Sequence, residues 1–377
     1  MDFTYSEEQQ MLADSLRRFV ESEYAFAARR TRSRTLGAFD REIWRALAEM
    51  GVLGLNIPAE YGGFGEGAAS RLVVQRELGR ALVLEPVIPA AVCAAAVLEN
   101  YGTPAQKDTW LTALASGDKI VTLAWQEPES RYRPEAVRTV AQPREGGGFV
   151  LDGCKSLVWH GEAADALIVS ARVAGSDELA LFLVGREVEG LTVTGYPTMD
   201  GLRAADLALS NAVVPEGALI GAVGDGLAAL GHAFDHGIAA LCAEAAGAME
   251  RLVEITSEYL RTRQQFGAAL ASFQALQHRV ADMLVHKELA LSMAYVAAQA
   301  LDEPDVAQRT RMLSAAKATV ARAGRFVGQQ AVQLHGGMGM TDELEVGDYF
   351  KRLAMVDTLF GDSDYHVERF CSAMQAG

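Results

Sequence analysis

Apolar side chains recur every three or four positions through much of the first 118 residues, a spacing typical of helices that bury one face. Ser6 and Gln9 have the spacing of a capping box at the start of one such stretch. That stretch continues with Met11, Leu12, Leu16, Phe19 and Val20. Similar patterns lie in the segments 41–54, 69–82 and 104–117. Pro and Gly in 56–67 predict a loop, so residues 1–118 are predicted to form a helical domain.

From about Lys119 the pattern changes to short runs rich in β-branched residues. These runs are "IVTLAW", "VRTVAQ", "GFVLDG", "ALIVSARV", "LALFLVG" and "LTVTGY". Turn-forming stretches such as "REGGG" separate them, and no pattern of helical length lies between them. Several short strands with such turns favour an antiparallel barrel or sandwich over residues 119–225. Prolines and glycines mark the end of this domain near Gly226.

Helical spacing returns over residues 226–377. Three long segments carry it: 242–265, 274–301 and 311–337. Gly336 and Gly337 end the third segment, as glycines do past the end of a helix. Long apolar helices with few breaks predict a bundle whose outer face is also buried, and we expect another subunit to cover it.

The charge, the cysteines and the apolar runs of the chain argue against several classes of function. The chain of 377 residues has 34 basic against 49 acidic residues, a net charge of −15, which argues against a nucleic-acid groove. The four cysteines form no CxxC pair and predict isolated thiols in a reducing cytoplasm. The amino terminus carries no signal-peptide pattern, and the longest apolar run, Ile88–Leu98, has 11 residues where a membrane span needs about 20.

Five short motifs occur in a characteristic order. They are "IPAEYGG" (Ile57–Gly63), "VVPEGALIG" (Val213–Gly221), "RTRQQFG" (Arg261–Gly267), "FQALQH" (Phe273–His278) and "QLHGGMGM" (Gln333–Met340). Each motif alone is weak, but the set at these spacings resembles the acyl-CoA dehydrogenase superfamily over essentially the whole chain. The resemblance implies an α+β multidomain fold with an amino-terminal helical domain, a middle antiparallel β-barrel and a carboxy-terminal four-helix bundle.

The resemblance also implies FAD as cofactor, an acyl-CoA substrate and an electron-transfer flavoprotein or similar acceptor. In this family the "RxxFG" and "QxxGG" elements reach across a dimer interface to the ADP end of the flavin nucleotide. By this likeness Arg263, Phe266, Gln274, Gln333, Gly336 and Gly337 are expected to contact FAD. Arg263 offers a fork of donors suited to a pyrophosphate, and glycines allow a backbone to approach a phosphate closely.

Two other patterns are weaker candidates. His232 and His236 have the i, i+4 spacing of metal ligands, but no third ligand is apparent and HExxH is absent, so ordinary hydrogen-bonded histidines are favoured and no metal site is predicted. "GAVGDG" (Gly221–Gly226) contains a lone GxG without the strand that a dinucleotide fingerprint needs, and it is interpreted as a linker.

The position of the catalytic base departs from the family pattern. The family usually carries a Glu directly before a glycine in a segment that follows the GGxG element. Counted from Gly336 without a gap, that glycine is Gly361, and Phe360 precedes it. Phenylalanine cannot accept a proton, and the nearest carboxylate is Asp362. The family's second position for a base corresponds to Gly237, which is followed by Ile238 in place of the usual arginine.

The middle domain departs as well. "QEPESRYR" (Gln126–Arg133) stands where the family carries a stretch like "TEPGAGSD" that lines the flavin ring and the thioester. Leu157, Val158 and Trp159 stand where a "WIT" stretch is expected. A bulky Trp159 in place of a small hydroxyl residue is expected to fill space that a flavin ring would occupy.

Together these features predict a subunit that completes the active site of another chain. The residues that reach a neighbour's flavin are kept, while those of the chain's own site are altered. The sequence most resembles the small subunit of heteromeric members of the family, of the pimeloyl-CoA dehydrogenase type. Its partner would then be a homologous large subunit.

Two alternatives stay open. The chain could be a self-sufficient homo-oligomer in which Asp362 is the base. It could also be a structural or interaction protein that binds no flavin, although a scaffold has no need for Arg263, Phe266, Gln333 and Gly337 in this order.

Overall fold

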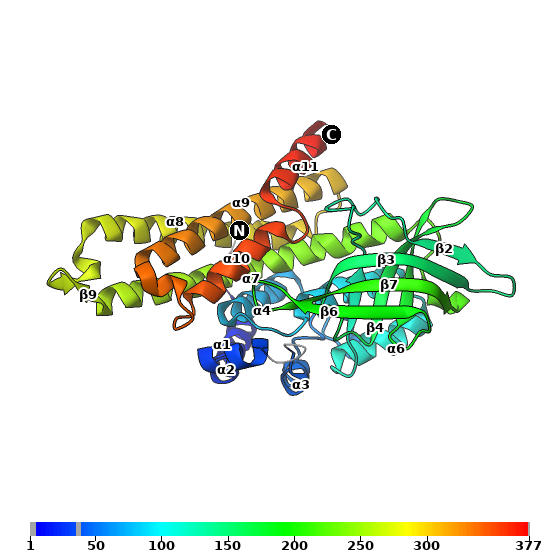
Figure 1. Cartoon of the computed structure of the whole chain (residues 1–377), viewed down its shortest axis with the longest axis horizontal. Coiled ribbons are helices and arrows are strands. Elements are labelled where there is room, and N and C mark those ends of the chain that lie inside the picture. Colours follow the sequence, from blue (N-terminus) through cyan, green and yellow to red (C-terminus); the bar gives the residue numbers. More distant parts are fainter. Residues whose placement is uncertain (1–4, 35–38, 376–377) are drawn as a thin grey trace. The chain divides into compact units, whose positions relative to one another are not determined.

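The computed structural model describes residues 5–34 and 39–375 (Figure 1). The chain divides into two compact units. The helical unit holds the described residues of Met1–Thr31, Ala68–Val83 and Ile238–Gly377, and the sheet unit holds those of Arg32–Gly67 and Leu84–Gly237. The domain boundaries at 118 and 225 stay a prediction.

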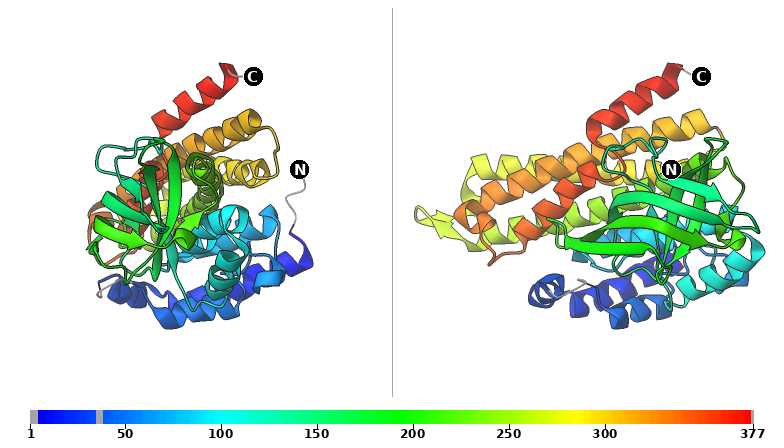
Figure 2. Two further views of the ribbon diagram at one scale, coloured as in Figure 1. Left: turned by 90° about the vertical axis from the view of Figure 1, so that its right-hand side faces the viewer. Right: turned by 45° about the vertical axis from the view of Figure 1, so that its right-hand side comes forward.

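Long helices form most of the helical unit. Helix α8 (Gln274–Ala300) lies beside α9 (Val306–His335), and both α10 (Val346–Thr358) and α11 (Ser363–Gln375) pack against α9 (Figures 1 and 2). Helix α7 (Gly226–Thr262) contributes its residues from Ile238 onward. Among the described residues five helices therefore follow the predicted boundary, one more than a four-helix bundle contains.

The amino-terminal helices of this unit are α1 (Glu7–Glu23), the first part of α2 (Phe26–Arg34) and α4 (Ala68–Ala81). The predicted capping box at Ser6 and Gln9 is confirmed, with both of its hydrogen bonds present. Leu16 is buried as a core residue of α1, whereas Met11 is 64% exposed. The predicted helix is therefore confirmed, but only part of the apolar face predicted for α1 is buried.

Glycines bring α4 and α7 into backbone contact. A Cβ built on Gly79 would lie 2.0 Å from the carbonyl oxygen of Glu244, and one on Gly247 would lie 1.9 Å from that of Arg76. No side chain fits at either position without moving a helix. The crossing then places Arg80 of α4 on Glu254 of α7, with both Nη atoms at 3.0 Å from its carboxylate oxygens.

The sheet unit contains the helices α3 (Arg41–Glu49), α5 (Ala95–Tyr101) and α6 (Pro104–Ala115) and the short elements η1 (Ala59–Tyr61), η3 (Glu216–Ala218) and η2 (Val87–Ala94), a π-helix. Its strands are β1 (Val121–Ala124), β2 (Val140–Pro143), β3 (Phe149–Trp159), β4 (Ala166–Val173), β5 (Leu179–Gly185), β6 (Leu191–Pro197), β7 (Arg203–Val214) and β8 (Leu219–Ile220). The six predicted strand runs all contribute to strands.

The predicted antiparallel barrel needs correction in two details. The strands follow the order β6-β7-β3-β2-β4-β5-β8, with β1 attached to β4, and this path does not close among the described residues. Both β1 and β2 pair with β4 in parallel, so the sheet is mixed. Strand composition cannot reveal either detail, because pairing direction depends on how the connections return to the sheet.

Strand β7 has no counterpart among the predicted strands. Alanine fills many of its inward positions, so the β-branched signal is weak, yet its buried and exposed positions largely alternate. All four cysteines are free thiols, as predicted. No helix in residues 5–34 or 39–375 combines the length and apolarity needed to cross a bilayer.

Candidate functional site

The carboxy-terminal end of α7 leads through Arg263 into a small hairpin that carries Phe266, and both are predicted site residues. Strands β9 (Gln264–Gln265) and β10 (Ala268–Ala269) pair around a turn at Phe266 and Gly267, whose φ angles are +55° and +79°. Arg263 is exposed just before the hairpin, and its carbonyl accepts a hydrogen bond from the Leu270 N–H at 2.9 Å. Phe266 is 91% exposed, so most of the apolar surface of its ring is in contact with water. This exposure is unfavourable unless a ligand or another chain covers the ring.

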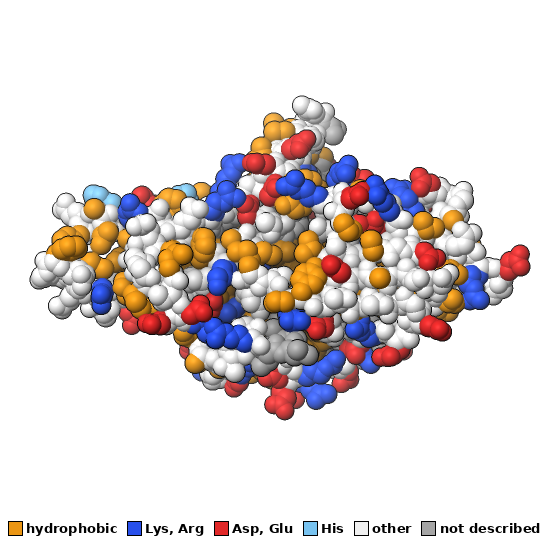
Figure 3. Space-filling view, viewed as in Figure 1, with side chains coloured by type: hydrophobic (Ala, Val, Ile, Leu, Met, Phe, Trp, Pro, Cys, Tyr) orange, Lys and Arg blue, Asp and Glu red, His pale blue; other side chains and the backbone are white. Residues whose placement is uncertain are grey.

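Gln274, the third predicted residue, is the first residue of α8 and is exposed. A short 3₁₀ turn, η4 (Leu270–Ser272), connects it to the hairpin. Figures 1 and 2 show the hairpin projecting beyond the adjoining helix ends. Hydrophobic side chains gather at the same end of the unit on the face seen in Figure 3.

The remaining three predicted residues lie at the end of α9. Gln333 is exposed in its last turn, and Gly336 follows the helix with φ +61° and ψ −140°, a conformation open to glycine alone. A Cβ built on Gly336 or on Gly337 would meet no atom within 4 Å. The backbone of η5 (Gly336–Met340) is therefore open to close approach from outside the chain.

Two contacts join these helix ends. Arg279 of α8 donates to Gln330 of α9 at 2.9 Å. Tyr259 of α7 stacks on His335 of α9, with ring centroids 4.3 Å apart. The six predicted residues thus lie on elements that meet at one end of the helical unit. Their chemistry fits one end of FAD, because an exposed guanidinium, two exposed amides and an open glycine backbone suit a pyrophosphate and its sugars.

The turn between α10 and α11 carries Phe360 and Gly361, with φ angles of +57° and +110°. Lys317 of α9 binds this turn: its Nζ donates to the Gly361 carbonyl at 2.7 Å and to the Asp357 carbonyl at 3.2 Å. Lys317 is completely buried, and burial lowers its pKa to about 8. His366 lies with Nε2 3.0 Å from the Phe360 carbonyl, and burial together with the charge of Lys317 lowers its pKa to about 3.

Asp362 serves the same turn as a helix cap. Its Oδ1 accepts the Tyr365 N–H at 2.9 Å, at the start of α11. Asp357 accepts from the Ser363 N–H and hydroxyl at 3.1 and 2.7 Å and also pairs with Arg325. The turn is therefore closed by its own hydrogen bonds, and the half-buried Asp362 is one of the groups that closes it.

The second position expected for a base offers no proton acceptor. Gly237 lies within α7, and the adjacent Ile238 is 1% exposed. Nearby, His232 accepts a hydrogen bond from the Asn100 amide at 2.8 Å and packs on His236, with ring centroids 4.6 Å apart. Within residues 5–34 and 39–375, no three His, Cys, Asp or Glu side chains are grouped to hold a metal ion.

In the sheet unit a buried ion pair anchors the segment "QEPESRYR". Glu127 accepts from Lys155 Nζ at 2.7 Å, from the Thr139 hydroxyl at 2.7 Å and from the N–H groups of Arg138 and Thr139 at 2.7 and 3.0 Å. Burial lowers the pKa of Lys155 to about 8, and the ammonium in turn keeps the pKa of Glu127 below its usual value against the effect of burial. The ion pair fastens this segment to β3.

The neighbouring bulge in β3 positions Leu157 and Trp159. The register with β7 shifts between Lys155 and Val158, and Leu157 takes φ +53° with its side chain 52% exposed. The Leu157 N–H donates to the Tyr196 hydroxyl at 3.2 Å. Trp159 is half-buried at the end of the strand. Whether its ring fills a flavin position stays a prediction.

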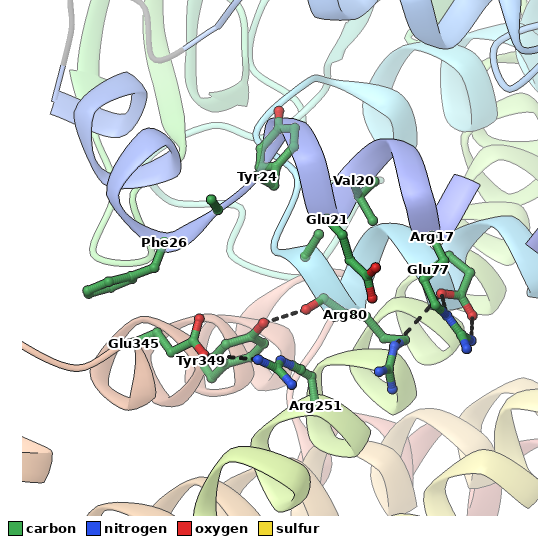
Figure 4. Close-up of a pocket in the computed structure, with 12 residues that line it drawn as sticks. Arg17, Val20, Glu21, Tyr24, Phe26, Glu77, Arg80, Arg251, Glu345 and Tyr349 are labelled. Atoms are coloured by element: carbon green, nitrogen blue, oxygen red, sulfur yellow. Dashed lines mark hydrogen bonds and ion pairs between the residues drawn. The ribbon is translucent and has the colours of Figure 1, made fainter. Parts of the chain in front are cut away.

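The helical unit also contains a cavity of about 270 Å³ among α1, α2, α4, α7 and α10 (Figure 4). Its charged groups largely pair with one another: Arg17 with Glu77 at 2.6 Å and Arg251 with Glu345 at 3.4 Å. None of the predicted site residues lines it. This internal pairing leaves the cavity without a clear preference for a charged ligand.

Sequence reasoning missed three groups in these sites: Lys317, the Glu127–Lys155 pair and the Tyr259–His335 stack. A signal existed only for Lys317, the one lysine within an alanine-rich apolar helix, where a charge must find a buried partner. The other two groups join elements that are far apart in the chain.

Comparison with known proteins places these features in context. Family models for acyl-CoA dehydrogenases match in three parts: the N-terminal domain over residues 6–118, the middle domain over 122–212 and the C-terminal domain over 224–374.

Individual relatives match over nearly the full length. The chain is 30% identical to 2-methylacyl-CoA dehydrogenase of Solanum tuberosum, over 94% of this chain and 88% of that protein. It is similar to a chain of the ChsE4-ChsE5 complex from Mycobacterium tuberculosis, with 27% identity, a TM-score of 0.89 and 100% of both chains covered. A glutaryl-CoA dehydrogenase from Mycobacterium smegmatis in complex with FADH2 matches with 25% identity and a TM-score of 0.90, over 99% of this chain and 96% of that one.

Proposed function

Since the chain belongs to the acyl-CoA dehydrogenase family of FAD-dependent oxidoreductases, we propose that it is a subunit that contributes FAD contacts to the active site of a homologous partner. The assembly would catalyse α,β-dehydrogenation of an acyl-CoA thioester. When bound, FAD supplies the hydride acceptor for this reaction. Arg263, Phe266, Gln274, Gln333, Gly336 and Gly337 would hold the nucleotide end of a flavin bound mainly by the partner.

The observation that carries the proposal is the closed turn at Phe360. The residue expected to be the base is an apolar side chain, and its turn is held by Lys317, His366 and Asp357. Asp362, the nearest carboxylate, accepts a backbone N–H of α11. Neither of the two positions expected for a base therefore carries one, while the predicted FAD contacts Arg263, Gln274 and Gln333 are exposed.

The outer face of α8 supports assembly with another chain. Leu284, Val285 and Leu289 are 43%, 66% and 47% exposed, and the i, i+4 spacing of Val285 and Leu289 places these two on one face of the helix. The similar chain from Mycobacterium tuberculosis is described as part of a complex of two named chains. We propose a homologous large subunit as the partner here, as in heteromers of the pimeloyl-CoA dehydrogenase type.

The experiment compares the chain alone, the candidate homologous large subunit alone, and their mixture. Bound FAD and turnover of acyl-CoA thioesters with an artificial electron acceptor are measured for each. We expect turnover only in the mixture, together with a hetero-oligomer in light scattering. Full flavin occupancy and turnover by this chain alone would contradict the proposal.

A self-sufficient homo-oligomer is the second candidate, and one observation favours it: Asp362 is a half-buried carboxylate two residues from the expected position. That candidate predicts loss of turnover in Asp362→Asn. A mixture that binds no flavin at all would instead support the third possibility, a structural or interaction protein.

A further inference from the structure

Tyr259 near the end of α7 and His335 at the end of α9 form a stacked pair between these two helices. Their ring centroids lie 4.3 Å apart with an interplanar angle of 28°. The Tyr259 hydroxyl also donates to the His335 carbonyl at 3.4 Å. Neither residue belongs to the predicted set of FAD contacts, but each is directly connected to it.

The two connections run through the backbone. The Arg263 N–H donates to the Tyr259 carbonyl at 2.8 Å, so Tyr259 sits one helical turn before the guanidinium. His335 is the last residue of α9 and directly precedes Gly336, whose unusual φ and ψ angles open the glycine turn. A displacement of either ring would therefore move one half of the predicted nucleotide surface relative to the other half.

The orientation of His335 is fixed by a single hydrogen bond. Nδ1 lies 2.8 Å from the Ala331 carbonyl, which can only accept, so Nδ1 carries the proton. The side chain is 3% exposed, and burial lowers its pKa. Nε2 is buried and has no hydrogen-bond partner among the described residues. Leaving a buried polar atom unsatisfied is unfavourable, so stability alone gives little reason for histidine at this position.

We propose that Tyr259 and His335 are positioning residues for FAD, setting the spacing between Arg263 on α7 and the Gly336–Gly337 turn on α9. This inference rests on the proposed function, because it concerns the same nucleotide surface. The pair itself would not touch the cofactor. It would hold the guanidinium and the open backbone at a separation that suits one pyrophosphate.

The test measures FAD affinity of the assembled complex and thermal stability in parallel. Tyr259→Leu and His335→Leu remove the stack, and Tyr259→Phe keeps it while removing the hydroxyl. The matched control is Phe326→Leu, which removes the tilted ring contact of Phe326 with His286, with centroids 4.1 Å apart, between α8 and α9. None of the predicted FAD contacts takes part in that control pair.

We expect Tyr259→Leu and His335→Leu to raise the dissociation constant of FAD about three- to tenfold, the range that an aromatic pair commonly contributes. The dissociation constant of FAD for Tyr259→Phe should stay within about twofold of the value for the parent protein. Phe326→Leu should lower the melting temperature without changing FAD affinity. KM for the acyl-CoA should be unchanged in all variants at saturating FAD, since the pair acts on cofactor binding.

Two outcomes would overturn the inference, and they are distinguishable. If Arg263→Ala weakens FAD binding while Tyr259→Leu and His335→Leu only lower stability, the pair is structural and the proposed function stands. If Arg263→Ala also leaves FAD affinity unchanged, the proposed function fails and the positioning role fails with it.

Discussion

Two regions of the helical unit differ in where their polar groups make hydrogen bonds. At the hairpin end, Arg263, Gln274 and Gln333 are exposed, and Phe266 offers an aromatic ring to solvent. At the turn between α10 and α11, Lys317 and His366 are fully buried and bonded to backbone carbonyls. The polar groups of the first surface are open to solvent, whereas those of the second bond within the chain, apart from His366 Nδ1, which has no hydrogen-bond partner among the described residues.

This difference separates two kinds of sensitivity. Polar groups whose donors and acceptors face solvent contribute little to the free energy of unfolding but are expected to contribute strongly to the binding of FAD. Groups whose bonds close within the chain contribute to the free energy of unfolding, because removing them leaves buried atoms without partners. Under the proposed function, this contrast is how a chain of this family would keep its fold and the predicted cofactor contacts while the turn at Phe360 serves the fold.

The largest effect is expected at the exposed end. Arg263→Ala should raise the dissociation constant of FAD from the assembled complex about 10- to 100-fold, the range for lost hydrogen bonds to a charged group. The unfolding midpoint should not change. FAD titration of the apo complex measures this, with Arg261→Ala, an exposed arginine on the same helix end, as the control. An equal loss in both variants would indicate a general charge effect.

Acid should weaken the turn through His366. Its folded pKa of about 3 lies below the ordinary value of 6.5, so below pH 6.5 the unfolded chain binds a proton that the folded chain excludes. The contribution of neutral His366 to the free energy of unfolding is therefore fully present above pH 6.5 and is lost as the pH falls. The loss is about 1.4 kcal/mol per pH unit, or about 2 kcal/mol between pH 6 and pH 4.5. Urea unfolding of the parent and of His366→Gln at both pH values measures the difference. Parallel losses in the two proteins would show that other groups cause the acid sensitivity.

Lys317→Met should lower the free energy of unfolding by about 1 to 2 kcal/mol at pH 7. Two buried carbonyls lose their donor, and this loss is partly offset because a buried ammonium with a lowered pKa is removed. FAD affinity of the complex should be unchanged. Denaturant unfolding and FAD titration of the same preparation test both statements. A loss of FAD affinity without a loss of stability would contradict the assignment of the turn between α10 and α11 to the fold and of the hairpin end to FAD binding.

The smallest effect is expected at Asp362. Asparagine caps helices about as well as aspartate, so Asp362→Asn should be nearly neutral, whereas Asp362→Ala should cost about 1 kcal/mol. Turnover by the complex should be the same for both variants. Abolished turnover in Asp362→Asn at unchanged stability would instead identify Asp362 as the base.

Much of the organisation could be predicted from the chain alone. Helical spacing, the capping box at Ser6 and Gln9 and the six strand runs depend on neighbours within a few positions, and the structure contains them. The motifs from Ile57 to Met340 indicated the family and its dependence on FAD, and both are confirmed. Strand β7 was missed because alanine carries little strand signal, and the open, mixed sheet was missed because pairing direction leaves no local trace.

The sequence by itself determined which residue types occupy each motif, including the phenylalanine before Gly361, because identity and spacing need no third dimension. Only the tertiary structure decided that Lys317 and His366 hold that phenylalanine's turn and that Asp362 caps α11. It also decided that Tyr259 meets His335, 76 positions away along the chain. The physical reason is that side chains become buried and find hydrogen-bond partners only when segments distant in the chain pack together. These partners determine whether a polar group stabilises the fold or stays available to bind a ligand.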